Sequence, residues 1–159
     1  MAAVGSPLPA PPKSLWEGEA DKSAEFPSEG KFIIVGVPGA FTPPCTSQVP
    51  GYVANADKFT EKGINDIFVV AVNDIFVVNA WKESIAKGSS VHFLSDSKGE
   101  FTKSLGQDFD ASGLLGNNRS KRYVAVVENG VIKSLQVEDA PPNITVTAAE
   151  KSWGACKFN

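Results

Sequence analysis

Three things are scarce in this sequence of 159 residues: side chains that bind metal or form disulfides, long apolar runs, and an excess of one charge. It holds two cysteines, Cys45 and Cys156, and one histidine, His92. Neither a disulfide framework nor a structural zinc site is therefore expected. No stretch approaches the roughly 18 apolar residues of a membrane span, and the N-terminus lacks an export signal. We expect a soluble intracellular protein.

The net charge is -3, with 15 basic and 18 acidic residues mixed along the chain. This balance provides no basic face for nucleic acid and no polybasic segment for anionic lipid, so neither is expected as a partner. The length is typical of one domain. We predict an irregular, proline-rich leader over residues 1–30 that contributes one short strand at most, and a single domain over residues 31–159.

Short apolar runs alternate with helical patterns after the leader, which predicts a β-α-β-α-β order over 31–37, 49–63, 67–72, 77–88 and 91–94. Continuous Val, Ile and Phe runs suit strands that are covered on both faces, so the centre of the sheet should be parallel. A short helix over 99–106, a hairpin over 122–137 that turns at Asn129-Gly130, and a last helix over about 147–155 complete the prediction.

The hexapeptide NDIFVV occurs twice, at 65–70 and 73–78, and its period of eight residues is too short for a solenoid unit. The first copy continues into a buried strand. Before the second copy, Asn73 or Asp74 can cap a helix with Val78 and Trp81 on one face. The same six residues are therefore expected in two different structures.

The segment PGAFTPPCT at 38–46 follows the first predicted strand. Ligands bind outside the carboxyl ends of strands in open α/β sheets, so this loop is a candidate site. If Cys45 lies in the first turn of a helix, free backbone N–H groups and the helix dipole favour thiolate over thiol. Cys45 is therefore a candidate nucleophile.

Thiolate formation alone does not make an efficient enzyme, because other groups must bind substrate and stabilise charge in the transition state. Thr42 can donate one hydrogen bond and accept another, and Pro38 has no N–H and can shield the sulfur. Strand alternation places Arg122 on one face with Val124 and Val126. Arg122 either pairs with the thiolate or reaches solvent at a frayed strand end, and the residues leave both open.

Pro38, Thr42 and Cys45 fit the PxxxTxxC signature of the peroxiredoxins, which the loop resembles. The wider chain, from about residue 31 to 150, resembles the type II, peroxiredoxin-5-like subfamily in the segments PGY (50–52), VNDIFVVNAW (72–81), LSDSKGEFTKSLG (94–106) and RSKRYVAVVENGVIK (119–133). The resemblance implies a thioredoxin-like α/β fold, with a central mixed sheet flanked by helices on both faces.

The resemblance also implies a peroxidase without metal or haem that reduces hydrogen peroxide and alkyl hydroperoxides. Cys45 would be the peroxidatic cysteine and become a sulfenic acid. Thr42 and Arg122 would hold the thiolate and the peroxide oxygens, Pro38 would shield them, and Arg119 would be a supporting or surface charge. Thioredoxin, glutaredoxin or glutathione would restore the thiol. A homodimer is expected on the same ground.

Two departures from the subfamily concern the helix start and the second cysteine. Gln48 and Val49 stand where a histidine is usual, and the stretch after Cys45 is one residue shorter. The positions at which some relatives carry a resolving cysteine fall near Val146 and near Val69, and neither residue is a cysteine. Cys156 either resolves Cys45 or has no catalytic role, in which case an external thiol reduces the sulfenic acid.

Three alternatives to a peroxidase would also use a reactive cysteine. A dithiol oxidoreductase needs a second cysteine beside Cys45, which is absent. A cysteine hydrolase needs a histidine base, and His92 fits the edge of the core better. A redox sensor that uses Cys45 with little turnover is the remaining alternative. The C-terminal KFN lacks the S-K-L address, so the cytoplasm is expected, although the resemblance also allows the peroxisome.

Overall fold

The main sheet of the computed structural model, which describes residues 3–155, has six strands in the order β1-β4-β3-β2-β7-β8. Strands β2, β3 and β4 are parallel at its centre, and β1, β7 and β8 are antiparallel to their neighbours. The thioredoxin-like mixed sheet is thereby confirmed. Strand bounds are β1 (Trp16–Glu17), β2 (Lys31–Val37), β3 (Ile64–Ala71), β4 (His92–Ser95), β7 (Tyr123–Glu128) and β8 (Val131–Val137).

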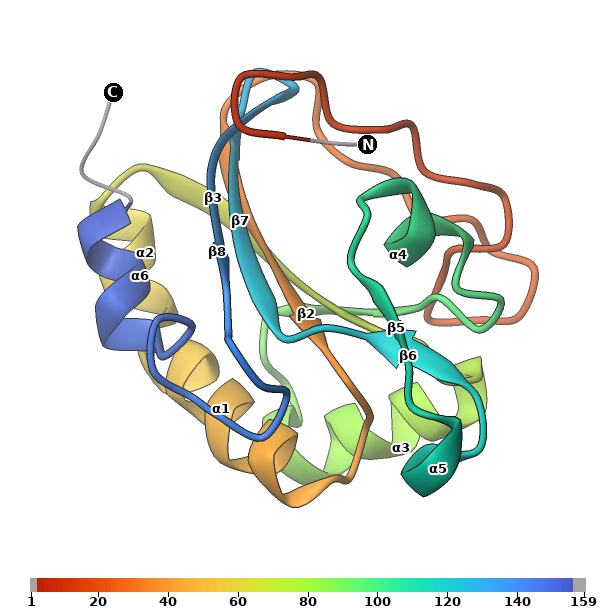
Figure 1. Cartoon of the computed structure of the whole chain (residues 1–159). Helices are drawn as coiled ribbons and strands as arrows, with labels where there is room; N and C mark the ends of the chain where they lie inside the picture. Colours follow the sequence, from red (N-terminus) through yellow and green to blue (C-terminus); the bar gives the residue numbers. More distant parts are fainter. Residues whose placement is uncertain (1–2, 156–159) are drawn as a thin grey trace.

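Helices cover both faces of the sheet unequally (Figure 1). One face packs against α1 (Pro43–Ala54), α2 (Ala56–Glu61), α3 (Ile75–Ala86) and α6 (Ala149–Ala155). The other face packs against α4 (Glu100–Ser104) and the leader, whose Leu15 and Phe26 join its core. The boundary at residue 30 stays a prediction. Within residues 3–155, no helix combines the length and apolarity needed to cross a bilayer.

A small second unit was not foreseen from the sequence. It consists of β5 (Asp108–Asp110) and β6 (Asn118–Ser120), which pair antiparallel, and the short helix α5 (Ser112–Leu115) between them. These elements are too short to leave a periodic pattern. They lie between α4 and β7 in the sequence, and the chain passes from β6 to Arg122 just before β7.

The predicted helix over 49–63 was wrong in its start and its continuity. Helix α1 begins at Pro43, and a break at Asn55 separates it from α2. Pro43 and Pro44 fit the first turn because the N–H groups they lack would have no partner within the helix. The other predicted elements appear with ends that are unchanged or shifted by a few residues. The early start is what puts Cys45 into the first turn.

The two NDIFVV copies adopt the two structures expected of them. The first lies in β3, and the second enters α3, where Asp74 Oδ1 accepts a hydrogen bond from the Val77 N–H at 2.9 Å. Val78 and Trp81 are buried on the sheet side of this helix. The Trp81 ring packs edge-on against Phe93. Asn73, the other candidate cap, instead accepts from the Ala40 N–H at 2.8 Å.

The leader protects both edges of the main sheet. Strand β1 pairs with β4 at one edge. At the other edge, Gly5 donates to the Ile132 carbonyl oxygen at 2.8 Å, and the Ile132 N–H donates to Ser6 at 3.0 Å. An isolated bridge joins Pro7 to Val131 beside these bonds. One segment thus occupies the hydrogen-bonding positions of two strands that would otherwise face water.

His92 fastens β1 to the sheet. Its Nδ1 lies 2.6 Å from Glu17 Oε2 on β1, and its Nε2 lies 3.2 Å from Asp66 Oδ1 on β3. The ring stacks on Phe68 at 4.6 Å. The hydrogen bond to Glu17, together with both carboxylate charges, raises the pKa of His92 above its usual value despite partial burial. Both ring nitrogens have carboxylate partners, so this imidazole is structural, as expected for the edge of the core.

Candidate active site

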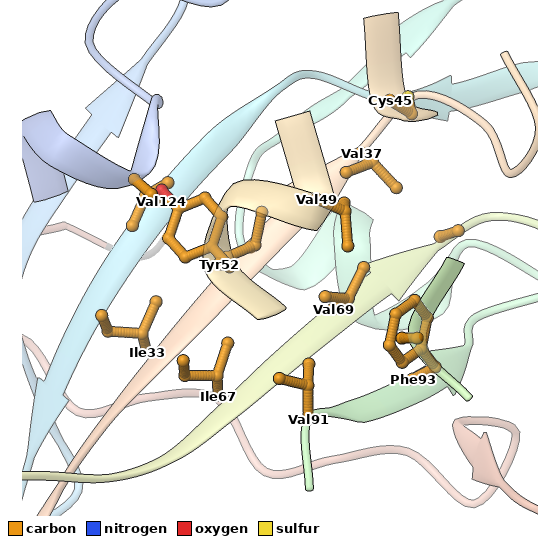
Figure 2. Packing of buried hydrophobic residues seen from close by; sticks show 14 of the residues in the cluster. Ile33, Val37, Cys45, Val49, Tyr52, Ile67, Val69, Val91, Phe93 and Val124 are labelled. Carbon is orange, nitrogen blue, oxygen red and sulfur yellow. The ribbon is translucent and has the colours of Figure 1, made fainter. Parts of the chain in front are cut away.

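Cys45 is the third residue of α1, directly after the loop that leaves β2. Phe41 has φ 64°, a left-handed conformation that a bulky side chain rarely adopts, and this bend turns the chain into the helix. Figure 2 shows Cys45 at one end of the apolar cluster, near Val37 and Val49. The side chain has no exposed surface and is a free cysteine. The sulfur therefore lies at a helix N-terminus inside an apolar wall.

Arg122 reaches Cys45 from the start of β7. Its Nη2 donates to Cys45 Sγ at 3.3 Å, and the residue is 1% exposed. Val124 and Val126 follow on the same face and belong to the same core cluster as Cys45. The alternative of a frayed, solvated Arg122 is therefore wrong. A buried guanidinium therefore lies within hydrogen-bond distance of the sulfur.

Two further acceptors fix the guanidinium of Arg122. Its Nη1 donates to Gln48 Oε1 at 2.5 Å, and its Nε donates to the Pro141 carbonyl oxygen at 2.8 Å. Gln48 is 3% exposed, and its Nε2 donates to the Thr147 carbonyl oxygen at 3.1 Å. In the sequence, Gln48 stands out only as a departure from the subfamily. Its spacing of three residues from Cys45 on one helix was the signal that could have found it.

Thr42 and Pro38 lie in the loop around the sulfur. Thr42 stands at the N-cap position of α1, and its Oγ1 donates to the Gly39 carbonyl oxygen at 2.8 Å. Because its proton is used there, the hydroxyl oxygen offers lone pairs to any further group. Pro38 and Thr42 border the same groove as Arg122. The structure thus gathers all four of the predicted site residues that it describes, and Cys156 lies outside the described residues.

Arg119 supports the loop from the other side. Its Nη1 donates to the Pro38 carbonyl oxygen at 3.2 Å, and its Nε donates to Asn117 Oδ1 at 2.7 Å. Burial lowers the pKa of Arg119, and the negative charge of Cys45 acts in the opposite direction. The side chain is half-buried, which agrees with a supporting charge.

A groove of about 550 Å³ opens beside Arg122. Its walls come from three stretches of chain: the loop before α1, the unit around α5, and the loop after β8. The walls are almost entirely apolar, with Arg122 and Thr42 at one side, and include Pro38, Pro44, Phe109, Leu114, Leu115 and Pro141. Pockets of this size and character hold small organic molecules.

Comparison with known proteins shows the family to which a chain with this site belongs. The redoxin family model matches residues 3–152. The chain belongs to the redoxin family, as a type II, peroxiredoxin-5-like peroxiredoxin. Peroxisomal membrane associated protein 20 of Schizosaccharomyces pombe is 58% identical to this peroxiredoxin over 153 residues, which cover 95% of this chain and 97% of that protein.

Solved structures agree over the whole fold of this peroxiredoxin. Peroxiredoxin 5 from Alvinella pompejana superposes with a TM-score of 0.86 at 32% identity, covering 99% of each chain. Reduced Prx3 from Vibrio vulnificus in complex with hydrogen peroxide gives 0.86 at 36% identity, covering 98% of this chain and 99% of that one. The peroxiredoxin described here is a thiol-dependent peroxidase, and a redox sensor with little turnover is not favoured.

Proposed function

We propose that Cys45 is the peroxidatic cysteine of this peroxidase. Its thiolate attacks the terminal oxygen of a hydroperoxide, so that an S–O bond forms while the O–O bond breaks. The electron pair of that bond leaves with the inner oxygen, which takes up a proton and departs as water or an alcohol. Sulfur becomes a sulfenic acid. One thiol then forms a mixed disulfide with loss of water, and a second thiol regenerates Cys45.

Arg122 is the group that lowers the barrier, and its contact with Cys45 Sγ is the observation that carries the proposal. Negative charge moves from sulfur to the departing oxygen during the attack. A guanidinium with several N–H donors can follow that charge without leaving its place. Gln48 and Pro141 hold the guanidinium in this orientation before substrate arrives. Little reorganisation is then needed in the transition state.

Thr42 and Pro38 complete the site. The Thr42 hydroxyl donates to the Gly39 carbonyl oxygen, so its lone pairs can accept the O–H of the hydroperoxide. Pro38 presents no N–H that would compete for the thiolate. Together these residues orient the terminal oxygen toward sulfur and exclude water.

Replacement of each cysteine in turn tests the assignment. Cys45→Ser should abolish peroxide consumption with a thiol donor, whereas Cys156→Ser should keep the first oxidation step at the normal rate. Both variants are to be measured by peroxide loss under matched conditions. Substantial activity in Cys45→Ser would remove it as the nucleophile.

An external thiol is proposed as the reductant, in the class of glutathione, glutaredoxin or thioredoxin. Cys45 is the one cysteine within residues 3–155. By the family resemblance, the second cysteine that some relatives hold would fall near Val146. Non-reducing gels after one equivalent of peroxide test this directly. Persistent sulfenic acid is expected, and a disulfide that disappears in Cys156→Ser would show that Cys156 resolves Cys45.

Alkyl hydroperoxides are proposed as good substrates, because the groove beside Arg122 is far larger than hydrogen peroxide requires. The alkyl part would lie on the apolar wall that includes Leu114. Cumene hydroperoxide should give a lower KM than hydrogen peroxide. Leu114→Ser should raise the KM for cumene hydroperoxide alone, and equal changes for both substrates would contradict this use of the groove.

A homodimer remains a proposal, supported by three exposed apolar side chains. Phe41 is 52% exposed, Phe76 75% and Leu114 88%, and water contact at such residues is unfavourable. Sedimentation of the purified chain, with Phe76→Ser for comparison, measures the assembly. A wild-type chain that sediments as a monomer at high concentration would rule the dimer out.

Cytoplasm and peroxisome are the two compartments proposed. The name of the Schizosaccharomyces pombe relative supports the peroxisome, whereas another relative, of Arabidopsis thaliana, is named as mitochondrial. An N-terminal fluorescent fusion distinguishes them by its overlap with a peroxisomal marker. A diffuse signal would favour the cytoplasm.

A further inference from the structure

The loop after β8 carries one wall of the groove and one of the contacts of Arg122. Residues 138–148 form neither helix nor strand, and several of them are exposed. Pro141 nevertheless accepts from Arg122 Nε, and Thr147 accepts from Gln48 Nε2 at 3.1 Å. Both carbonyl groups must be held in place for the guanidinium to keep its direction. Packing alone does not hold the Pro141 carbonyl group, because a hollow of about 160 Å³ borders Pro141 and Arg122.

A buried carboxylate anchors this loop at several points, in addition to the bond that Tyr52 Oη donates to the Thr147 carbonyl oxygen at 2.6 Å. Glu138 is 7% exposed. Its Oε2 accepts from the Thr145 N–H at 2.6 Å, from the Thr147 N–H at 2.9 Å and from Thr147 Oγ1 at 2.6 Å. Its Oε1 accepts from Thr145 Oγ1 at 2.6 Å. Charge-assisted bonds of this kind are among the strongest in proteins, and four of them converge on one side chain.

Glu138 is also joined to the strand that carries the guanidinium. Its backbone N–H donates to the Arg122 carbonyl oxygen at 3.0 Å. The carboxylate thus ties the far part of the loop, at Thr145 and Thr147, back to the base of Arg122. Two routes lead from it to the guanidinium: one through Pro141, and one through Thr147 and Gln48.

We infer that Glu138 is a positioning residue for the peroxide step, acting through residues 141–147 on the orientation of Arg122. The inference rests on the proposed role of Arg122. Glu138 touches neither sulfur nor the groove, and the hydrogen bonds that lead from its loop toward the sulfur pass through that guanidinium. No motif in the sequence marks it, because its partners follow seven and nine residues later in an irregular loop.

The test is the peroxide step of pre-reduced protein with Glu138→Gln. The amide nitrogen brings N–H donors toward the donors of Thr145 and Thr147, so the loop loses part of its anchor. We expect the second-order rate constant for hydrogen peroxide to fall about 10- to 100-fold, as displacements near 1 Å do elsewhere. Asp139→Asn, a neighbouring exposed carboxylate, is the matched control and should leave the rate unchanged.

A double-variant cycle separates positioning from general destabilisation. In an Arg122→Met background, Glu138→Gln should cost less than about twofold, since the group it acts through is gone. The same fold loss in both backgrounds would overturn the inference, and so would a folded Glu138→Gln with a normal rate. If Arg122→Met itself has a normal rate, the proposed function of Arg122 fails instead.

A second variant covers the case in which Glu138→Gln does not fold. Thr145→Val removes one of the four hydrogen bonds and keeps the backbone bond. A smaller loss of rate is expected, again absent in the Arg122→Met background. A rate equal to wild type, with a lowered melting temperature, would leave Glu138 a structural residue only and would overturn the inference.

Discussion

Arg122→Met is the most informative perturbation of the site. Methionine keeps much of the length and volume of arginine but carries neither charge nor donor. Arg122 is 1% exposed and makes three hydrogen bonds, to Cys45 Sγ, Gln48 Oε1 and the Pro141 carbonyl oxygen. The variant therefore removes one contact to the reacting atom and leaves two acceptors without that partner, Gln48 Oε1, which is buried, and the Pro141 carbonyl oxygen, which is half-buried.

The expected loss of rate follows from the contact with sulfur. A hydrogen bond to a charged group contributes about 1.5–3 kcal/mol, and each ~1.4 kcal/mol is tenfold in rate. The contact alone therefore corresponds to about 10- to 150-fold. Donors aimed at an oxygen that gains charge are worth about 10²- to 10³-fold. We expect kcat/KM for hydrogen peroxide to fall by about 10²- to 10³-fold.

Stopped-flow fluorescence of the pre-reduced protein measures this step. Trp81 Nε1 donates to Thr46 Oγ1 at 3.3 Å, directly beside Cys45, so oxidation of the sulfur should alter its emission. The two unsatisfied acceptors cost about 1–3 kcal/mol each in stability, so circular dichroism must confirm folding. Arg122→Lys keeps the positive charge, concentrated on one ammonium group, so its kcat/KM for hydrogen peroxide should fall less than that of Arg122→Met. A folded Arg122→Met within about threefold of wild type would refute the reasoning.

Two further predictions concern stability. A raised folded pKa means that protonated His92 stabilises the protein fully below its unfolded pKa of about 6.5, and that this contribution disappears as pH rises through the folded value. The free energy of unfolding of wild type should exceed that of His92→Gln near pH 6, by about 1 kcal/mol or less after solvent screening, and match it at high pH; a constant difference would contradict the linkage. In Gly36→Ala, the new Cβ would lie 1.9 Å from the Tyr123 ring. Urea unfolding should show a loss of about 3 kcal/mol, and Gly113→Ala, whose Cβ meets nothing within 4 Å, should be near neutral; equal losses would refute the packing argument.

Much of the fold could be predicted because its strands carry strong local signals. The runs 31–37 and 131–137 became β2 and β8 with unchanged ends. Alternation also placed Arg122 on the face of Val124 and Val126 correctly, since period-two geometry holds along any regular strand. The predicted start of the first helix was wrong, because Pro43 begins that helix instead of lying in the loop before it.

The parts that could not be predicted depend on contacts between distant segments. Gln48 meets Arg122 across 74 residues, and Glu138 acts through an irregular loop. Neither residue type nor local spacing predicts such hydrogen bonds, because in the sequence a buried amide or carboxylate cannot be told from a polar residue on the surface. The family signature identifies the reacting groups, whereas the residues that orient them, Gln48 and Glu138, are recognisable only in the three-dimensional structure.

The leader has a consequence for the behaviour of the protein in concentrated solution. Its residues near Gly5 and in β1 fill the main-chain bonding positions of β8 and β4 at once. Removal of the leader would expose β4 and β8 as edge strands at the same time. Unpaired edge strands can pair with strands of neighbouring molecules. Proteolytic loss of the leader is therefore expected to promote edge-to-edge aggregation through both sides of the sheet, even though every catalytic group stays in place.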